Sequence, residues 1–486
     1  MEFAQMVSPL AEARQLIAGL DREVPLLDGR KRLYVNLDNA ATTPPFRDIL
    51  PMIGRFADWY SSIHRGTGFK SLLSSELYDQ CREIVARFVG ADPAYHVVIF
   101  CANTTDAINK LCRRLHLGPD EVVLTTVMEH HSNLLPWRLS GNVDYVGIKS
   151  DNGSLDVEHF EEKMHEHEGR VRVVAVTGAS NTTGCMPPIH KIARMAHAHG
   201  AYLLVDGAQL VAHRPVSMGP ADEPERIDFL AFSAHKMYAP FGTGVLVGPR
   251  EFFSDGTPSA VGGGTVELVT LNEVEWTTPP EREEAGTPNL MGVLTLAKAI
   301  QILESLGMEK IAQHQRELTS YALRRLQQVP GIRIYGETDS SLHCDRVGVI
   351  PIVAERFDHA LLAAILSYEW GIGVRHGCFC AHTYVGHLFE LDNESLDGFM
   401  KQVREGDRSN LPGFVRISLG VYNTVEEIEY LAAALETIAA QGPKGRYRFD
   451  KRTGEYSPVG FAHDLNAYNP LAASRGSPLD AAPSGV

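Results

Sequence analysis

The runs AYLLVD at 201–206, IDFLAFS at 227–233 and GTGVLVG at 242–248 decide the predicted fold. Each run is short and almost wholly apolar, which is typical of a strand buried on both faces of a sheet. Similar runs lie upstream and alternate with helical stretches: VVIF at 97–100, a helix over about 105–115, VVLTT at 122–126, VVAVT at 173–177 and a helix over about 189–199. Such alternation is typical of βα units, so the sequence predicts an α/β fold with a mostly parallel sheet.

Further along the chain the pattern changes. Two long helices are predicted, and strands with helices between them follow: the helices lie around 294–306 and 309–328, and the strands near 331–335, 346–352 and 413–419. This order is typical of a smaller α+β domain. The polar and charged stretch ELDNESLDGFMKQVREGDRSN at 390–410 is predicted to be a surface excursion or a lid.

We therefore expect four parts along the chain. A short helix over 8–20 indicates an N-terminal arm, and a shift to Pro, Gly, Ser and Ala marks a C-terminal extension. The expected boundaries are 1–32 for the arm, which packs on the small domain, 33–298 for the large domain, 299–440 for the small C-terminal domain and 441–486 for the extension. We expect the extension to be partly disordered, because its composition cannot easily offset the entropy lost on ordering.

Composition argues against several classes of protein. The 486 residues include 45 Lys and Arg against 60 Asp and Glu, which gives a net charge of −15. Residues of both signs are interspersed along the chain, with no long basic stripe, so we expect no nucleic-acid partner. No window approaches about 18 consecutive apolar residues, and the first residues lack the apolar core of a secretory signal. The 7 cysteines are irregularly spaced, which favours free thiols over a disulfide framework. We expect a cytoplasmic protein with no membrane partner.

One candidate site lies in CANTTDAIN at 101–109, where a predicted strand passes into a helix. Thr104 and Thr105 fall in the first helical turn. Backbone N–H groups and hydroxyls at a helix N-terminus bind anions, phosphate above all. The alternative is plain N-capping of the helix by Asn103 or Thr104.

Two charged residues end the next strands. Asp206 directly follows a buried run in VDGAQ, where a carboxylate needs a cation or a donor. Lys236 ends FSAHK after the following strand; its alternative is a lysine whose stem packs on the surface. Because ligands bind at the carboxyl ends of strands in open α/β sheets, we expect these groups to converge. A phosphate anchor, a buried carboxylate and an amine together fit pyridoxal 5'-phosphate (PLP).

A longer series of motifs carries a family resemblance. The motifs are LDNAATTP (37–44), SSIHRGTG (61–68), TTDAIN (104–109), MEHHSNLLPW (128–137), SNTTG (180–184), VDGAQ (205–209), FSAHKMYAPFGTGVL (232–246), EAGTPN (284–289), GIGVRHGCFCAH (371–382) and VRISLGVYNT (415–424). Together they resemble the class V, fold-type I aminotransferase superfamily over roughly residues 33–440. Within it the chain is most similar to group II cysteine desulfurases and selenocysteine lyases, and its GCFC run is similar to the desulfurase domain of molybdenum-cofactor sulfurases.

The resemblance implies a fold-type I enzyme with a seven-stranded, mostly parallel sheet and with PLP as its cofactor. Lys236 would hold PLP covalently, Asp206 would pair with the pyridine nitrogen, and His130 would stack on the ring. Asn181 and Gln209 would hydrogen-bond around the substrate carboxylate and the ring oxygen, respectively. The cofactor phosphate would be bound by residues matching Thr104, Thr105, Ser233 and His235, with Thr287 supplied by the neighbouring subunit.

The substrate implied by the resemblance is a small amino acid. Arg416 would bind its α-carboxylate, a task suited to the bidentate geometry of guanidinium, and the remaining pocket residues would be Ala40, Ala41, Arg375 and Asn423. The role of Thr287 implies a homodimer with composite active sites, to which Arg65 would also contribute across the interface.

The reactive thiol implied by the family pattern is Cys380, because it precedes Ala at the position of the nucleophile. Cys378 is either a structural thiol or an auxiliary one. A metal-binding pair is not expected, because no second pair of cysteines lies at a suitable spacing. The thiolate form of Cys380 would be favoured by His376, by His382 or by the cofactor environment.

The predicted function is a cysteine desulfurase that converts L-cysteine to L-alanine and leaves a persulfide on Cys380. A sulfur-acceptor protein would be a further partner. The residues after the nucleophile, His382 and Thr383, depart from the family pattern. The alternative is therefore another class V reaction, such as that of a selenocysteine lyase, a C–S lyase, an epimerase or a transaminase, in which Cys380 carries no sulfur.

Overall fold

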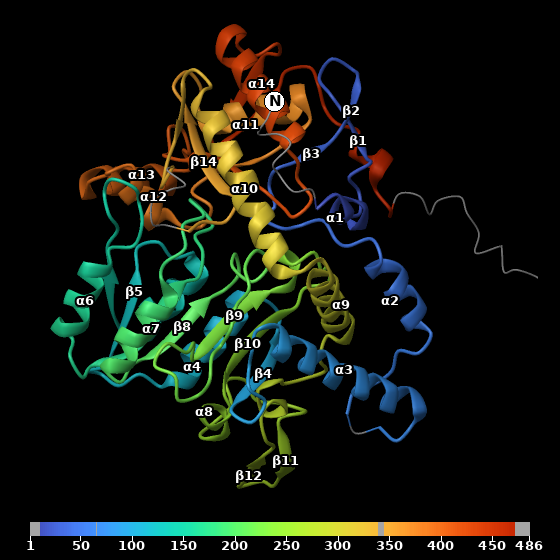
Figure 1. The fold of residues 1–486 in the computed structure, drawn as a ribbon, viewed down its shortest axis with the longest axis vertical. Helices are drawn as coiled ribbons and strands as arrows, with labels where there is room; N and C mark the ends of the chain where they lie inside the picture. The colour runs from blue at the N-terminus through green and yellow to red at the C-terminus, as the bar shows by residue number, and fades with distance from the viewer. Residues whose placement is uncertain (1–9, 65, 339–344, 472–486) are drawn as a thin grey trace, which may run out of the picture.

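A computed structural model describes residues 10–64, 66–338 and 345–471. Its main feature is a seven-stranded sheet of order β4-β10-β9-β8-β7-β5-β6 (Figure 1). The strands are β4 (His96–Cys101), β5 (Val122–Thr126), β6 (Asn142–Val146), β7 (Val171–Thr177), β8 (Tyr202–Asp206), β9 (Phe229–Ser233) and β10 (Gly244–Pro249). Neighbouring strands are parallel except that β10 runs antiparallel to β4 and β9. The predicted α/β fold with a mostly parallel sheet is confirmed.

Side chains alternate between the two faces of this sheet. Val174, Val205 and Leu230 belong to one buried cluster, whereas their neighbours Leu204 and Phe229 belong to another on the opposite face. Because both faces are buried, the strands are continuous apolar runs. The first cluster includes side chains of α3 (Phe69–Phe88), α6 (Val157–Glu166), α7 (Ile189–Ala198) and α9 (Leu290–Leu306), and the second includes those of α4 (Thr104–Leu115), α5 (Leu135–Ser140) and α8 (Arg250–Ser254).

A second, smaller sheet has the order β13-β14-β17-β16. Its strands are β13 (Ile332–Ile334), β14 (Val349–Ala354), β16 (Arg375–Gly377) and β17 (Phe414–Ser418), and its helices are α10 (Met308–Gln327), α11 (His359–Trp370) and α14 (Val425–Gln441). They share a buried cluster separate from those of the large sheet. In the same cluster, β3 (Val35–Asn36) pairs in parallel with β15 (Ile372–Gly373), so an N-terminal segment packs into this part of the molecule.

The N-terminal segment contacts both parts. Its helix α1 is Ala11–Leu16, shorter than the helix predicted over 8–20, because Ile17 has extended backbone and pairs with Phe46. A hairpin of β1 (Glu23–Pro25) and β2 (Lys31–Leu33) follows, and the N–H of Leu27 donates to the carbonyl of Tyr368 in α11. Helix α2 (Ile49–Ala57) then leads into the large sheet and its helices.

The charged stretch 390–410 is more ordered than a loop. Helix α12 (His382–Leu388) precedes it, and helix α13 (Asn393–Arg404) forms within it, capped by Asp392, whose side chain accepts from the N–H of Ser395. Helix α13 has no buried residue. The expected surface excursion is therefore an exposed helix, and its polar composition hid its periodicity.

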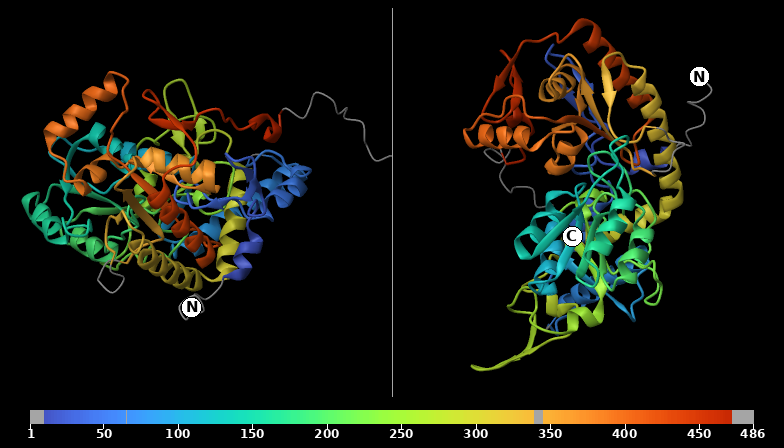
Figure 2. Two further views of the ribbon diagram at one scale, coloured as in Figure 1. Left: turned by 90° about the horizontal axis from the view of Figure 1, so that it is seen from above. Right: turned by 90° about the vertical axis from the view of Figure 1, so that its left-hand side faces the viewer.

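Two hairpins complete the description. The hairpin of β11 (Val266–Val269) and β12 (Val274–Trp276) projects from the body, as Figure 2 shows. The hairpin of β18 (Tyr447–Asp450) and β19 (Glu455–Pro458) belongs to the C-terminal extension and is followed by the short helix η4 (Leu465–Tyr468). The short helices η1 (His131–Asn133), η2 (Ala234–Lys236) and η3 (Glu281–Glu283) lie in loops that follow β5, β9 and β12.

Two further observations bear on the sequence analysis. In the described part of the chain, no single helix is long and apolar enough to cross a membrane; the pair α9 and α10, bent by 75°, meets that test only as a pair, by length and composition. Cys185 is disulfide-bonded, so the expectation that all cysteines are free thiols is wrong for this residue. Free thiols are present at Cys81, Cys101, Cys112, Cys378 and Cys380.

Candidate active site

A cavity of about 410 Å³ opens at the carboxyl ends of the large sheet's parallel strands, facing the small sheet. It is lined by the described site residues that the sequence suggested, with the exception of Thr287, Asn423, Cys378, His376 and His382. Those lining it are Ala40, Ala41, Thr104, Thr105, His130, Asn181, Asp206, Gln209, Ser233, His235, Lys236, Arg375, Cys380 and Arg416. Segments far apart in sequence therefore meet where an open α/β sheet binds its ligand.

Lys236 and Asp206 lie on neighbouring strand ends. Asp206 is the last residue of β8, and Lys236 ends η2, the turn directly after β9. Burial lowers the pKa of Lys236 to about 8, against the opposing effect of Asp206. Burial also raises the pKa of Asp206, although the N–H of Ala208, 3.0 Å from its Oδ1, and Lys236 favour the charged form. A buried carboxylate of this kind suits a cationic partner such as a protonated pyridine.

A cluster of hydroxyls surrounds the N-terminus of α4. Asn103 caps the helix by accepting from the N–H of Asp106 at 2.9 Å. The hydroxyls of Thr104 and Ser233 lie 2.6 Å apart, and Thr105 pairs likewise with Ser132 at 2.7 Å. Both of the roles considered for this turn, capping and anion binding, are therefore compatible, because Asn103 caps while the hydroxyls line the cavity.

Close backbone packing holds this turn in place. Gly244, the first residue of β10, lies so near Asn103 that a Cβ at this position would clash with the Asn103 backbone. Glycine lets β10 approach the cavity-lining turn of α4.

His130 is held as a neutral ring. Burial, and then the nearby Lys236, lower its pKa to about 4, and its Nδ1 lies 3.0 Å from the hydroxyl of Ser132. The preceding Glu129 is fully buried and accepts hydrogen bonds from the side chains of Thr126 and Asn133 and from the N–H of Thr177. This network, which the sequence did not reveal, fixes the segment that carries His130.

Arg416 is a buried cation whose side chain makes two hydrogen bonds to the protein. Its Nη1 donates to the carbonyl of Asn181 at 3.1 Å, and its Nη2 donates to Oδ1 of Asp38 at 3.0 Å. Its Nε is buried without a hydrogen-bond partner in the described residues. Arg375 donates to the same Asp38 from its Nε at 3.0 Å. Two arginines anchored by one aspartate form a site for a carboxylate.

Cys380 lies in a loop with unusual backbone geometry. We call residues 377–381 the reactive-cysteine loop. Phe379 has φ +53° and Cys380 has φ +56°, a left-handed conformation uncommon for residues with side chains. Nδ2 of Asn181 donates to the carbonyl of Phe379 at 2.8 Å, and the N–H of His131 donates to that of Cys380 at 2.7 Å. The loop is thus tied to the large sheet with the exposed Cys380 facing the cavity.

The second thiol of the loop is directed elsewhere. Sγ of Cys378 donates to the carbonyl of Pro412 at 3.1 Å, and burial raises the pKa of Cys378 to about 11. The neighbouring histidines are also engaged: His376 bonds Glu455 at 3.0 Å, and His382 stacks on His131 at 4.9 Å.

Several predicted residues lie outside the cavity or support it indirectly. Asn423 is buried and donates to the carbonyl of Asn36 while accepting from Asn39 and Gly420, so it supports the segment before Ala40. Thr287 is exposed and does not line the cavity of its own chain. Arg65 lies outside the described residues.

The sequence analysis missed several cavity-lining residues. The cavity-lining residues not predicted as such are Asn103, Ser132, Thr177, Ala179, Ala208 and Phe379. Asp38 was not predicted either; it accepts a hydrogen bond from Arg416. Phe379 packs its ring 4.6 Å from the guanidinium carbon of Arg416. Asp38 lies within the motif LDNAATTP (37–44), which was the one signal for it.

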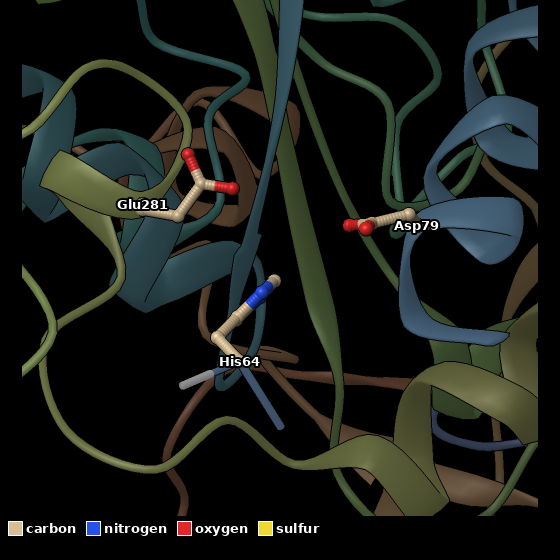
Figure 3. A group of neighbouring side chains, drawn as sticks. All are labelled: His64, Asp79 and Glu281. Atoms are coloured by element: carbon tan, nitrogen blue, oxygen red, sulfur yellow. The ribbon is translucent and has the colours of Figure 1, made fainter. Parts of the chain in front are cut away.

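Two groups of side chains away from the cavity could hold a metal ion by spacing. Figure 3 shows the first, His64, Asp79 and Glu281, which come from three separate segments and have ligand atoms within 4.8 Å of one another. The second consists of Asp144, Glu166 and His167, but Nζ of Lys163 lies 2.9 Å from both carboxylates and already forms ion pairs with them. Neither group lines the cavity.

Comparisons with known proteins agree with this geometry. The model of the family "Aminotransferase class-V" matches residues 35–431. A probable cysteine desulfurase of Halalkalibacterium halodurans is 32% identical over 434 residues, 87% of this chain and 97% of that protein. A cysteine desulfurase of Haloferax volcanii is 32% identical over 83% of this chain and 88% of its own length.

Solved structures are similar as well. The apo structure of a cysteine desulfurase from Thermococcus onnurineus superposes with a TM-score of 0.72 at 29% identity, covering 84% of this chain and 95% of that one. An S-sulfonic acid form of a cysteine desulfurase from Escherichia coli gives 0.71 at 26% identity, covering 88% and 98%.

The cavity fits PLP on its own observations. A buried Asp206 suits the pyridine nitrogen, Lys236 with its lowered pKa suits covalent attachment, and hydroxyls at the start of α4 suit a phosphate. By the extent of the family match and the identity to its relatives, this chain belongs to the aminotransferase class-V family and is a PLP-dependent enzyme.

Proposed function

We propose that the protein is a cysteine desulfurase, which converts L-cysteine to L-alanine and receives the sulfur as a persulfide on Cys380. The observation that carries the proposal is the placement of Cys380, an exposed thiol that lines the same cavity as Lys236 and the buried Arg416. An enzyme that only exchanged amino groups would need no thiol at this position. Relatives named as cysteine desulfurases support the assignment.

The cofactor's chemistry is limited to one contribution, which is to accept electrons when Cα of the bound substrate loses a proton. Lys236 serves as the base for that proton, because its lowered pKa leaves part of the amine neutral near pH 8. Asp206 would pair with the ring nitrogen and favour its charged form, and His130, held neutral by its lowered pKa, would lie beside the ring without adding a positive charge.

The binding roles follow from the contacts. The guanidinium of Arg416, which lines the cavity, binds the substrate α-carboxylate together with the exposed Arg375. Gln209 donates to the carbonyl of Ala40 at 2.6 Å and so supports the wall beside the ring. Thr104, Thr105, Ser233 and His235 bind the cofactor phosphate, and Asn181 acts mainly by holding Phe379 and Arg416 in place.

The transfer step balances without an added oxidant. The thiolate of Cys380 attacks the sulfur of the substrate, forming an S–S bond as the Cβ–S bond breaks. The electron pair of the broken bond stays with carbon, which takes up a proton and yields alanine. The persulfide then needs a reductant or a sulfur-acceptor protein, and we propose the latter as the physiological partner.

A pair of matched variants tests the proposal. After incubation of the PLP-loaded enzyme with L-cysteine, mass spectrometry should find one added sulfur atom on Cys380 in the wild type and in Cys378→Ser, and none in Cys380→Ser. Alanine release should follow the same pattern. Full turnover by Cys380→Ser, with a keto acid or a D-amino acid as product, would instead assign another class V reaction.

Three further proposals accompany the function. We propose a homodimer, since Thr287 is exposed and the projecting hairpin β11–β12 carries exposed Leu268 and Leu271.

We propose that the chain divides into arm, large domain, small domain and extension, since the two sheets have separate buried clusters. We also propose the cytoplasm as the compartment, because a free, exposed Cys380 requires reducing conditions, although Cys185 is disulfide-bonded.

A further inference from the structure

The C-terminal hairpin lies beyond the region that the family model matches, which ends at residue 431. We call residues 443–463 the strap. One end of the strap is fixed to α11: the carboxylate of Glu369 accepts from the N–H groups of Lys444 and Gly445 and from the hydroxyl of Tyr447. Further along, His463 stacks on Tyr368 with ring centroids 5.1 Å apart. The strap is therefore built into the small part of the molecule.

The middle of the strap reaches the strand that leads into the reactive-cysteine loop. Oε2 of Glu455 lies 3.0 Å from Nε2 of His376 in β16. Nδ1 of His376 lies 3.2 Å from Nδ1 of His359 in α11, and Nε2 of His359 lies 3.0 Å from the carbonyl of Leu411. A continuous chain of polar contacts thus links Glu455 to Leu411.

This series of contacts flanks the reactive-cysteine loop on both sides. His376 is followed by Gly377, which has φ +102° and begins the loop. Leu411 is followed by Pro412, whose carbonyl accepts from Sγ of Cys378 within the loop. Gly413 packs on Gly377 and His359 so closely that a Cβ at Gly413 would clash with both. Fixing the two histidine rings therefore fixes both flanks of the loop.

This series of contacts requires one proton more than two neutral imidazole rings carry. A carboxylate and a carbonyl can only accept, so Glu455 and Leu411 each need a donor, and the contact between the two Nδ1 atoms needs a third hydrogen. Two neutral imidazoles carry only two ring hydrogens between them. The two rings must therefore share one positive charge.

The charges around the pair are few. From α11, Asp358 faces His359, and from β19, Glu455 faces both rings and Tyr456 lies near Asp358. From β16 itself, the guanidinium of Arg375 points to Asp38. The two carboxylates beside the histidines, Asp358 and Glu455, favour a positive charge shared by His359 and His376.

We propose that Glu455, His376 and His359 are positioning residues through which the strap holds the reactive-cysteine loop in the geometry that Cys380 needs for attack on the substrate sulfur. The proposal rests on the proposed function for its consequence, but not for its structure. When the pair loses its proton, one of the three hydrogen bonds is lost and the loop is held less firmly. Persulfide formation then slows without a loss of substrate binding, because the arginines that bind the carboxylate are untouched.

Hydrogen exchange of the PLP-loaded enzyme tests the positioning without reference to activity. After correction for intrinsic rates, amides of residues 376–382 should exchange about two- to fivefold faster at a pH where the histidine pair has lost its proton than at a lower pH where the pair holds it. In Glu455→Gln the change should move to lower pH, since Gln removes the charge that favours protonation. In His376→Gln it should disappear.

Arg448→Gln is the matched control, because Arg448 lies on the same hairpin opposite Ser457 and its substitution also changes one charge. This variant should exchange as the wild type does. Identical exchange profiles for wild type, Glu455→Gln and His376→Gln would overturn the proposal. Glu455 has a side chain 61% exposed, so its amide variant is expected to fold, and a thermal melt checks this.

Activity separates this proposal from the proposed function. In Glu455→Gln, at a pH where the wild-type pair still holds its proton, kcat for persulfide formation should fall about two- to fivefold with KM for cysteine unchanged. An equal effect on KM, or a uniform loss at every pH, would contradict a positioning role. If the wild type forms no persulfide but its hydrogen exchange still changes with pH as described, the positioning role of the strap is supported and the desulfurase assignment fails.

Discussion

At the scale of single residues, Arg416 offers the sharpest test of substrate binding. Its Nη1 and Nη2 each make one hydrogen bond, to Asn181 and Asp38, which leaves a further N–H on each nitrogen. Arg416→Lys keeps a charge but loses the planar fork, so kcat/KM for cysteine should fall about ten- to hundredfold. Arg375→Lys should cost less, because Arg375 is exposed. Steady-state kinetics of both variants measure this, and equal losses would contradict the assignment.

Lys236 gives a prediction about pH. Burial places its pKa near 8 instead of the ordinary 10.5, so the amine becomes neutral at lower pH than usual. The rate at which cofactor-free protein takes up added PLP covalently should therefore rise with pH, reach half of its plateau near pH 8 and level off above that. In Asp206→Asn the midpoint should move lower still, since the aspartate raises this pKa. Visible absorbance follows the reaction, and a rise continuing toward the ordinary lysine value would contradict the prediction.

The residues that the sequence revealed and those it missed differ in kind. Lys236, Asp206 and Arg416 carry chemistry that is unusual at a strand end, so a motif exposes them. Asp38, Glu129 and Phe379 act by contacts with residues distant in sequence, such as the two arginines that share Asp38. No pattern along the chain records such a pairing, and only the fold brings these side chains together.

At the scale of elements, the close approach of β10 to the start of α4 is testable. A Cβ at Gly244 would clash with the backbone of Asn103, so Gly244→Ala should destabilise the protein by about 1–3 kcal/mol and speed the loss of PLP. Gly54→Ala is the control: Gly54 is helical with open space around it, and alanine there should stabilise by up to about 1 kcal/mol. Thermal melts and cofactor dialysis measure both effects. Unchanged cofactor retention in Gly244→Ala would show that the turn does not anchor the phosphate.

The elements that the sequence predicted were those with strong apolar patterning. The buried central strands were found because both of their faces are covered, whereas β6, the seventh strand at the sheet edge, reads NVDYV and has only one fully buried residue. Helix α13 was missed for the same reason, since none of its residues is buried. Hydrophobic periodicity reports burial, so edge strands and exposed helices leave little signal.

At the scale of the whole molecule, the cavity of one chain is incomplete if Thr287 is a phosphate ligand. Thr287 is exposed and lines no part of its own cavity. The projecting hairpin β11–β12 exposes Leu268 by 65% and carries a fully exposed Leu271 near its tip, an arrangement costly in water unless covered. The proposed homodimer would account for both features.

Mixing inactive subunits tests this arrangement directly. In Lys236→Ala the covalent attachment point is lost, and in Thr287→Ala a phosphate ligand is lost, so each homodimer should be inactive at limiting PLP. If Thr287 serves the partner's site, a mixed dimer combines the intact Lys236 of one subunit with the intact Thr287 of the other in a single complete site. Desulfurase activity should therefore return when the two variants are unfolded and refolded together, and not when they are mixed without subunit exchange. If Thr287 served its own chain, no mixed dimer would hold a complete site, and the absence of recovery would contradict the composite active site.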